Sequence, residues 1–284
     1  MFLTYIFLIA YSIALLALIS LGLAVIFGMM KVINLAHGEF MMLGAYAAVL
    51  SSSAGIPYIL SVLFATMMVG VFGVIVERLI VRRLYGRIID TLLATWGLSL
   101  LLVGVATASF GPQALSIQAV SGSVSIAGTN FSLYSLFVIG VAAAMLVGTW
   151  MLAVFTNIGL IVRGTIQRSD IADALGVNTD FVYMGTFAYG SAMAGLAGAV
   201  LAPLTGASPM MGTVFVSKAF INVIVGGGLP LIGTAIASTL FGTIDGLVSY
   251  IRTSIAGEVA VLICAVLLLR ILPQGITGRF KRGI

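Results

Sequence analysis

Long uninterrupted runs of hydrophobic residues dominate this sequence, and the few charged positions separate them. No Asp, Glu, Lys or Arg occurs within 1–30, 40–76, 91–162, 181–217 or 219–244. A transmembrane helix needs about 20 mostly apolar residues to cross roughly 30 Å of hydrocarbon. We therefore expect an all-α, polytopic helical membrane protein that forms a single transmembrane domain over residues 1–284.

Glycine, proline and charged positions divide these runs into candidate spans. The predicted ranges are 4–29, 35–51, 57–76, 91–110, 133–156, 183–203, 214–229, 231–250 and 255–272. We expect about eight to nine spans, two of which are broken or re-entrant segments that enter the membrane only part way.

The basic residues indicate the orientation of the chain. Lys and Arg concentrate in 77–90, in 157–182 and in the tail after 272, and the positive-inside rule places such segments in the cytoplasm. The N-terminus then lies outside, and the uncharged loop 111–132 is extracytoplasmic. Within that loop, 115–120 and 123–126 alternate around Ser121-Gly122. This pattern fits either a small hairpin or an irregular surface loop.

The composition excludes several classes of protein. The chain is 61% hydrophobic and only 7% charged, against about 45–50% and 25% in ordinary soluble domains, so a soluble enzyme, a nucleic-acid binder and a disordered protein are excluded. With one cysteine, Cys264, and one histidine, His37, the chain has no Cys/His zinc site. It also lacks a G-x-x-x-x-G-K-[ST] loop for ATP hydrolysis. We expect no catalytic residues, no metal and no cofactor bound by this chain, and no nucleic-acid partner.

Two glycine-interrupted segments resemble each other. Gly38 and Gly44 lie six residues apart and alanines follow them, and Gly227 and Gly233 repeat this spacing around Pro230. Each segment comes after a lysine and an asparagine. Paired, broken hydrophobic segments in two halves of a chain point to the substrate site of a transporter. The pattern therefore predicts an inverted repeat.

Several polar residues fall inside or near the spans. His37 and Glu39 form either a hydrogen-bonding pair in a pathway or gate, or an interfacial pair beside lipid headgroups. Lys218 has two candidate partners, Asp245 and Glu258, because charged residues within membranes usually pair or face a cavity.

A row of small residues, Gly190, Ala194 and Gly198, recurs every four positions on one predicted helix. Such rows let helices approach closely in lipid. We interpret this row as static helix packing in preference to a mobile interface that lines a pathway.

The cytoplasmic loop 157–182 predicts a short amphipathic helix. Ser169 can cap it, Asp170 stands in its first turn, and Gly176 is suited to end it. The helix either docks on a cytoplasmic partner or is simply solvated.

The sequence resembles a known family in several segments. Residues 24–46, AVIFGMMKVINLAHGEFMMLGAY, are similar to a signature of the permeases of branched-chain amino acid ABC importers. Segments 195–203 and 225–227 are also similar to patterns of that family. The family's cytoplasmic motif is matched by Arg163, Gln167, Asp170, Ala172, Ala174, Leu175 and Gly176, with Asp170 where the family usually has Glu.

Within that superfamily, the segment 83–100 most resembles the urea-transport branch. It contains RLYGR at 83–87 and DTLLATWGLSL at 90–100, but has Ile88-Ile89 where that branch would have Pro-Leu.

The resemblance implies a transmembrane permease of the bacterial inner membrane that imports urea or a similar small amide by alternating access. A branched-chain amino acid is the alternative substrate. The implied partners are a homologous second permease, two cytoplasmic ABC ATPases that bind the ATP, a periplasmic substrate-binding protein and membrane lipid. The residues expected to couple to the ATPases are Arg163, Gln167, Asp170, Asp173, Ala174, Leu175 and Gly176.

We expect the substrate pathway to use amide side chains, open backbone groups and an aromatic wall, which suit a flat neutral solute. The expected residues are Asn34, His37, Glu39, Thr95, Trp96, Asn222, Gly226, Gly227 and Gly228. A stand-alone channel or secondary transporter and an intramembrane enzyme are the competing hypotheses.

Overall fold

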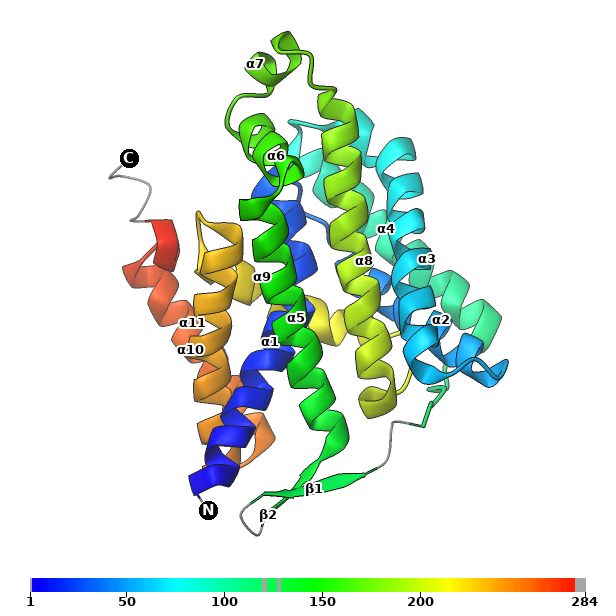
Figure 1. Cartoon of the computed structure of the whole chain (residues 1–284), viewed down its shortest axis with the longest axis vertical. Coiled ribbons are helices and arrows are strands. Elements are labelled where there is room, and N and C mark those ends of the chain that lie inside the picture. The colour runs from blue at the N-terminus through cyan, green and yellow to red at the C-terminus, as the bar shows by residue number, and fades with distance from the viewer. Residues whose placement is uncertain (1, 119–121, 127–128, 279–284) are drawn as a thin grey trace. The chain divides into compact units, whose positions relative to one another are not determined.

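The computed structural model describes residues 2–118, 122–126 and 129–278, and these are almost entirely helical (Figure 1). The helices are α1 (Phe2–Met30), α2 (His37–Ser53), α3 (Tyr58–Leu79), the 3-10 turn η1 (Val81–Leu84), α4 (Ile88–Phe110), α5 (Leu133–Phe155), α6 (Asn157–Gln167), α7 (Ser169–Ala174), α8 (Thr179–Thr205), α9 (Met211–Gly226), α10 (Pro230–Ile251) and α11 (Ser254–Ile271). Two strands, β1 (Ser123–Ile126) and β2 (Thr129–Ser132), complete the described elements.

The all-α membrane fold predicted from the hydrophobic runs is confirmed. Within the described residues, 7 helices are long and apolar enough to cross a membrane. The helices α2 and α9 contain only 17 and 16 residues. At 1.5 Å per residue, each reaches about 25 Å, which is less than a full crossing of about 30 Å. They correspond to the predicted ranges 35–51 and 214–229.

The chain forms two compact units. One unit contains residues 1–20, 118–147 and 218–284, and the other contains residues 21–117 and 148–217. We call them the α10–α11 unit and the α2–α3–α8 unit, after the helices that make their most extensive contacts.

Small residues hold the α2–α3–α8 unit together. A Cβ on Gly198 of α8 would stand 2.5 Å from the carbonyl carbon of Met41 in α2, and one on Gly44 would meet the backbone of Gly195. Gly190 approaches Gly22 of α1 equally closely. The predicted row of small residues is therefore a packing surface on which α8 contacts α1, α2 and α3.

The α10–α11 unit uses glycines in the same way. Gly242 and Gly246 of α10 lie against Ile13 and Ile9 of α1, where added Cβ atoms would come within 3.0 Å of the α1 backbone. The rings of Tyr5 and Tyr250 also meet there, with centroids 4.2 Å apart.

The loop 111–132 contains a hairpin, but with different strands from those predicted. β1 pairs antiparallel with β2, Ser123 opposite Ser132 and Ile126 opposite Thr129. The predicted partner of β1, 115–120, does not form the second strand: Leu115 instead pairs with Ala207, with N–H to O distances of 2.9 and 2.8 Å, and residues 119–121 lie outside the described residues. The burial of Phe131 against Phe7 of α1 explains why β1 pairs with β2, since β2 carries this aromatic ring into the protein.

Candidate substrate pathway and coupling segment

The chain breaks between α1 and α2, and a threonine from α4 stabilises this first break. The Thr95 hydroxyl accepts a hydrogen bond from the Leu35 N–H at 3.1 Å and lies 3.2 Å from the Ile33 carbonyl oxygen. Within a membrane, backbone groups freed by a helix break must be satisfied internally. Thr95 therefore holds the break in shape, and its hydroxyl is already engaged by the protein.

Three predicted pathway residues lie buried at or just after this break. Asn34, His37 and Glu39 are at most 1% exposed. The Asn34 side-chain oxygen accepts from the Ala36 N–H at 3.1 Å, while Asn34 Nδ2 and Glu39 Oε2 have no hydrogen-bond partner within the described structure. The interpretation of His37 and Glu39 as residues beside lipid headgroups is wrong, because both side chains are buried within the protein. Buried polar atoms with unused hydrogen bonds are where a polar solute or water can bind.

A second threonine stabilises the break between α9 and α10. The Thr277 hydroxyl donates to the Gly226 carbonyl at 2.6 Å and accepts from the Leu229 N–H at 3.0 Å. Gly227 has a φ of +83°, and a Cβ there would lie 3.0 Å from the Cα of Gly275. We expected this break to present open backbone groups. Its Gly226 carbonyl, however, already accepts the hydrogen bond from Thr277. Gly228 is half-exposed.

Asn222 lies one turn before this second break and is fully buried. Its Nδ2 donates to the hydroxyls of Ser20 at 2.9 Å and Ser238 at 2.7 Å, while its Oδ1 has no partner among the described residues. The buried Thr234 hydroxyl is likewise unpartnered there. Each break thus has a threonine hydroxyl that ties the broken backbone and a buried asparagine with one unpartnered amide atom, a donor in Asn34 and an acceptor in Asn222.

The predicted pathway residues divide between the two units. Asn34, His37, Glu39 and Thr95 come together in the α2–α3–α8 unit, and Asn222 with Gly226–Gly228 belongs to the α10–α11 unit. Trp96 differs from the others because 53% of it is exposed on the surface of α4.

The coupling segment begins with α6, which Thr156 caps by accepting from the Gly159 N–H at 3.1 Å. Arg163 stands midway along α6 and directs its Nε to the Gly159 carbonyl at 3.3 Å, and Gln167 is the last residue of the helix. α6 is therefore a helix of its own that connects α5 to α7, the predicted coupling helix.

The coupling helix α7 ends as predicted but begins differently. Gly176 adopts a φ of +86° and the Val177 N–H reaches back to the Ala172 carbonyl at 3.0 Å, the hydrogen bond of a Schellman termination. Ser169 is already the first helical residue and makes no side-chain cap.

Arg168 precedes α7 and forms two hydrogen bonds, of 3.1 and 2.9 Å, with the Asp170 carboxylate. These bonds lower the pKa of Asp170 and raise that of Arg168. The carboxylate expected to face a partner is therefore paired within the segment itself.

The apolar side of α7 points into solvent. Leu175 is 79% exposed and Ile171 is 46% exposed, although both are large hydrophobic side chains. Asp173 turns the other way and accepts from the Thr179 hydroxyl at 2.9 Å, which ties α7 to the start of α8. A protein that binds the Leu175 side chain would therefore be linked to α8 through the hydrogen bond between Asp173 and Thr179.

A cluster of polar and charged side chains at the end of α3 was not predicted from the sequence. Glu77 is fully buried, accepts hydrogen bonds from the Tyr85 hydroxyl and from Arg82 Nε at 3.3 Å, and Arg82 also lies 3.4 Å from the Asp180 carboxylate. Burial and the hydrogen bond to Glu77 raise the pKa of Tyr85. The cluster links the end of α3 to the beginning of α8. Sequence offered no signal for it beyond a glutamate at the end of a predicted span.

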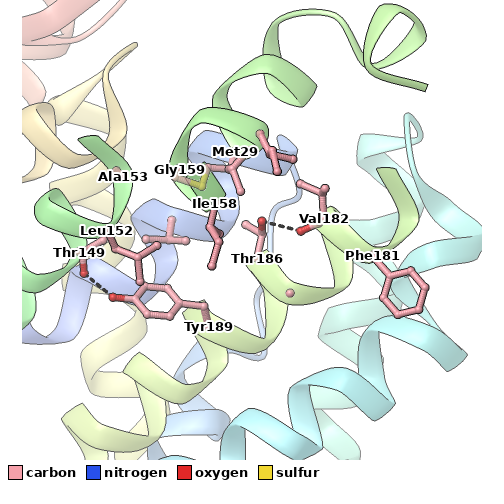
Figure 2. Close-up of a pocket in the computed structure, with 14 residues that line it drawn as sticks. Met29, Thr149, Leu152, Ala153, Ile158, Gly159, Phe181, Val182, Thr186 and Tyr189 are labelled. Atoms are coloured by element: carbon pink, nitrogen blue, oxygen red, sulfur yellow. Dashed lines mark hydrogen bonds between the residues drawn. The ribbon is translucent and has the colours of Figure 1, made fainter. Parts of the chain in front are cut away.

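An apolar cavity of about 440 Å³ lies between the end of α1, the end of α5, the helix α6 and the first half of α8 (Figure 2). Figure 2 shows the Thr149 and Tyr189 hydroxyls in a 2.7 Å hydrogen bond on its wall, and the Thr186 hydroxyl bonded back to the Val182 carbonyl at 2.7 Å. The predicted pathway residues do not line this cavity.

The predicted ion pair of Lys218 is confirmed with one of its two candidates. Lys218 Nζ lies 2.7 Å from Glu258 Oε1, so α9 and α11 are joined within their unit. Asp245 instead accepts from the Ser249 hydroxyl at 3.3 Å.

The family model described as "Branched-chain amino acid transport system / permease component" matches residues 5–272. Similar proteins include the high-affinity branched-chain amino acid transport system permease protein LivH of Escherichia coli, 28% identical over 93% of this chain and 91% of that protein. A probable branched-chain amino acid transport permease protein LivH of Methanocaldococcus jannaschii is 28% identical over 93% and 89%. BraD of Pseudomonas aeruginosa, also named as a high-affinity branched-chain amino acid transport system permease protein, is 26% identical over 93% and 91%.

The fold is also similar to a solved structure. PsaBC from Streptococcus pneumoniae, determined in complex with Fab, aligns with a TM-score of 0.53 over 98% of this chain and 94% of that chain, at 15% identity. The relatives reported above give no support for a special closeness to urea permeases. The match across almost the entire sequence shows that the chain belongs to the family of permease components of branched-chain amino acid transport systems, and it is therefore a non-catalytic, multi-pass subunit of the inner membrane.

Proposed function

We propose that this chain is the membrane-spanning subunit of an ATP-binding cassette importer for branched-chain amino acids. The observation that carries the proposal is the family match over residues 5–272, together with relatives named for this transport, such as LivH of Escherichia coli, which aligns over 93% of this chain and 91% of its own length. The proposed partners are a second permease subunit, two cytoplasmic ATPases and a substrate-binding protein on the outer face.

The exposed face of α7 supports docking of an ATPase. Leu175 and Ile171 present an apolar surface on a helix whose C-terminal end is fixed by the Gly176 termination and by the bond from Thr179 to Asp173. A large exposed side chain on a rigid helix is a suitable anchor for a groove on a partner. We propose that the coupling segment, Arg163 to Gly176, transmits ATPase movement to α8 in this way.

The glycine contacts support movement of α8 together with α2 and α3. Interlocked backbones resist sliding, because packed helices have few intermediate arrangements. The Glu77, Arg82 and Asp180 cluster adds a polar connection between α3 and α8. A displacement of α7 would thus move the first break, with Asn34 and Glu39, as part of one body.

The two breaks supply the proposed pathway groups. In the α2–α3–α8 unit, Asn34, His37 and Glu39 offer buried amide, imidazole and carboxyl groups, and Thr95 shapes the backbone beside them. In the α10–α11 unit, Asn222 offers a buried amide oxygen one turn before the Gly226–Gly228 break. An amino acid zwitterion needs one partner for its carboxylate and another for its ammonium group, which the Asn34 amide N–H groups and the Glu39 carboxyl can provide. Trp96 is exposed on α4, so we assign it to contact with lipid or with the second permease.

The test is uptake by the complete importer in proteoliposomes, reconstituted with its ATPases and binding protein. We expect ATP-dependent uptake of leucine that isoleucine and valine inhibit and that a large excess of urea leaves unchanged. ATP-dependent urea uptake without leucine uptake would support the resemblance of segment 83–100 to the urea branch and refute the proposed substrate. Solute flux through the permease without ATPases would refute the importer itself and indicate a channel.

A further inference from the structure

A second cavity, of about 500 Å³, opens in the α2–α3–α8 unit at its cytoplasmic end. The end of α1, the segment from Leu84 to Ile88, the last turn of α6 and the first turns of α8 surround it. Its polar lining comes chiefly from Lys31, Tyr85, Arg87, Ser169 and Tyr183. Neither the expected pathway residues nor the exposed face of α7 forms part of it.

Lys31 is the unusual residue of this cavity. It is the only non-glycine residue with a positive φ, +53°, within the described parts of the chain, and its N–H closes α1 on the Phe27 carbonyl at 2.9 Å. Its side chain is exposed, and no carboxylate of the described residues pairs with its ammonium group. The backbone at the end of α1 thus presents an unneutralised cation at the cavity.

Arg87 is the second cation of the cavity and is only partly neutralised. Its Nη2 lies 2.5 Å from Asp90 Oδ2, and both side chains stay solvent-accessible at 68% and 36%. Two cations and one carboxylate leave the cavity with a net positive charge, which favours an anion.

Two tyrosines form a fixed wall beside these cations. The Tyr85 hydroxyl is bound to the buried carboxylate of Glu77, and its ring centroid is 5.0 Å from that of Tyr183. Tyrosines are enriched at the level of the lipid headgroups, and the basic segment 77–90 places this wall on the cytoplasmic side. The cavity therefore lies where headgroups of the inner leaflet would lie.

An apolar stripe runs from the cavity along α4 into the membrane. Ile88 lines the cavity and is 51% exposed. Ile89, Leu93, Trp96 and Leu100 follow at helical spacing and are 53–73% exposed. A free phosphate ion would use only the cations, whereas a phospholipid would also cover this stripe with an acyl chain.

We propose that this cavity binds the phosphate group of an anionic phospholipid from the cytoplasmic leaflet. Lys31 and Arg87 contact the phosphate, the Tyr85 and Tyr183 rings form the wall of the headgroup site, and one acyl chain lies along the α4 stripe. Basic pockets between transmembrane helices on the cytoplasmic side suit such headgroups.

The experiment uses the assembled transporter, purified in detergent after exchange into mixed phosphatidylglycerol and phosphatidylcholine, with retained lipid measured by mass spectrometry. We expect phosphatidylglycerol to be retained selectively, and Lys31→Gly and Lys31→Gln to lower its retention at least fivefold, while Lys31→Arg preserves it. Lys31→Gly tolerates the positive φ, so it separates loss of charge from misfolding. Arg270→Gln is the matched control, because it removes an exposed cation near the end of α11 outside the cavity.

Equal retention by the Lys31→Gly and Arg270→Gln variants would overturn the proposal. Equal retention of phosphatidylcholine, or displacement of the lipid by millimolar inorganic phosphate alone, would overturn it as well. A second permease subunit could cover the α4 stripe in place of lipid. In that case the amount of retained lipid would depend on dimer formation and not on the presence of phosphatidylglycerol, and this result would also refute the proposal.

Discussion

Replacing Gly198 of α8 by alanine should force α8 away from α2. The added Cβ would stand 2.5 Å from the carbonyl carbon of Met41 and closer still to its oxygen. Carbon atoms in favourable contact are about 3.5–4.0 Å apart, so the helices would have to separate by about 1 Å. The obstacle is backbone, which cannot rotate away as a side chain can.

The same helix supplies a matched control. Gly185 also lies within α8, and a Cβ there would meet nothing within 4 Å. Both substitutions gain the same helix propensity, about 0.5–1 kcal/mol. The difference in their free energies of unfolding therefore isolates the overpacking at Met41, which we expect to be about 1–3 kcal/mol.

Unfolding of the purified permease by SDS in mixed micelles measures this difference. We expect Gly185→Ala to be as stable as the natural sequence or more so, and Gly198→Ala to be less stable than Gly185→Ala by the stated amount. Equal stability of the two variants would refute the close contact between α8 and α2, and with it the argument that these helices move as one body.

Three further predictions test the coupling segment, the second break and the buried glutamate. Leu175→Asp should abolish ATP-driven uptake without preventing membrane insertion, while Leu175→Met should retain uptake, and normal transport by the aspartate variant would contradict the docking proposal. Thr277→Val should lose both hydrogen bonds at the second break and destabilise the protein by about 1–3 kcal/mol, whereas Thr277→Ser should be near normal in the same SDS titration; equal stability of the two variants would argue against this role. Tyr85→Phe should cost about 1–3 kcal/mol, because it leaves the buried Glu77 with one hydrogen bond fewer, and an unchanged unfolding transition would show that the bond contributes nothing.

The sequence alone determined the fold class and the approximate position of each long helix. Uncharged runs of sufficient length have few alternatives to membrane-spanning helices, because lipid requires every backbone group to be bonded within the segment. The glycine at position 176 likewise determined the end of α7, since the positive φ of that termination strongly favours glycine. The small residues of α8 were recognisable as a packing surface from their spacing.

The resemblance in segment 24–46 identified the family, but one segment could not identify the substrate. The similarity of 83–100 to the urea branch runs from η1 into the first half of α4, where Leu93, Trp96 and Leu100 are exposed. Exposed side chains on α4 contact lipid or a partner subunit. Their identities therefore carry little information about which solute the protein transports.

Only the tertiary structure decided which polar groups of the predicted pathway are free to bind a solute. Sequence placed Thr95 and Gly226 in the pathway, yet the Thr95 hydroxyl and the Gly226 carbonyl are occupied by hydrogen bonds within the protein. The partner of Gly226 is Thr277, which lies 51 residues further along the chain. Periodicity reports the local path of the backbone, whereas hydrogen bonds between distant segments depend on how the helices pack. The same reason explains why β1 pairs with β2 and why the Glu77 cluster was not foreseen.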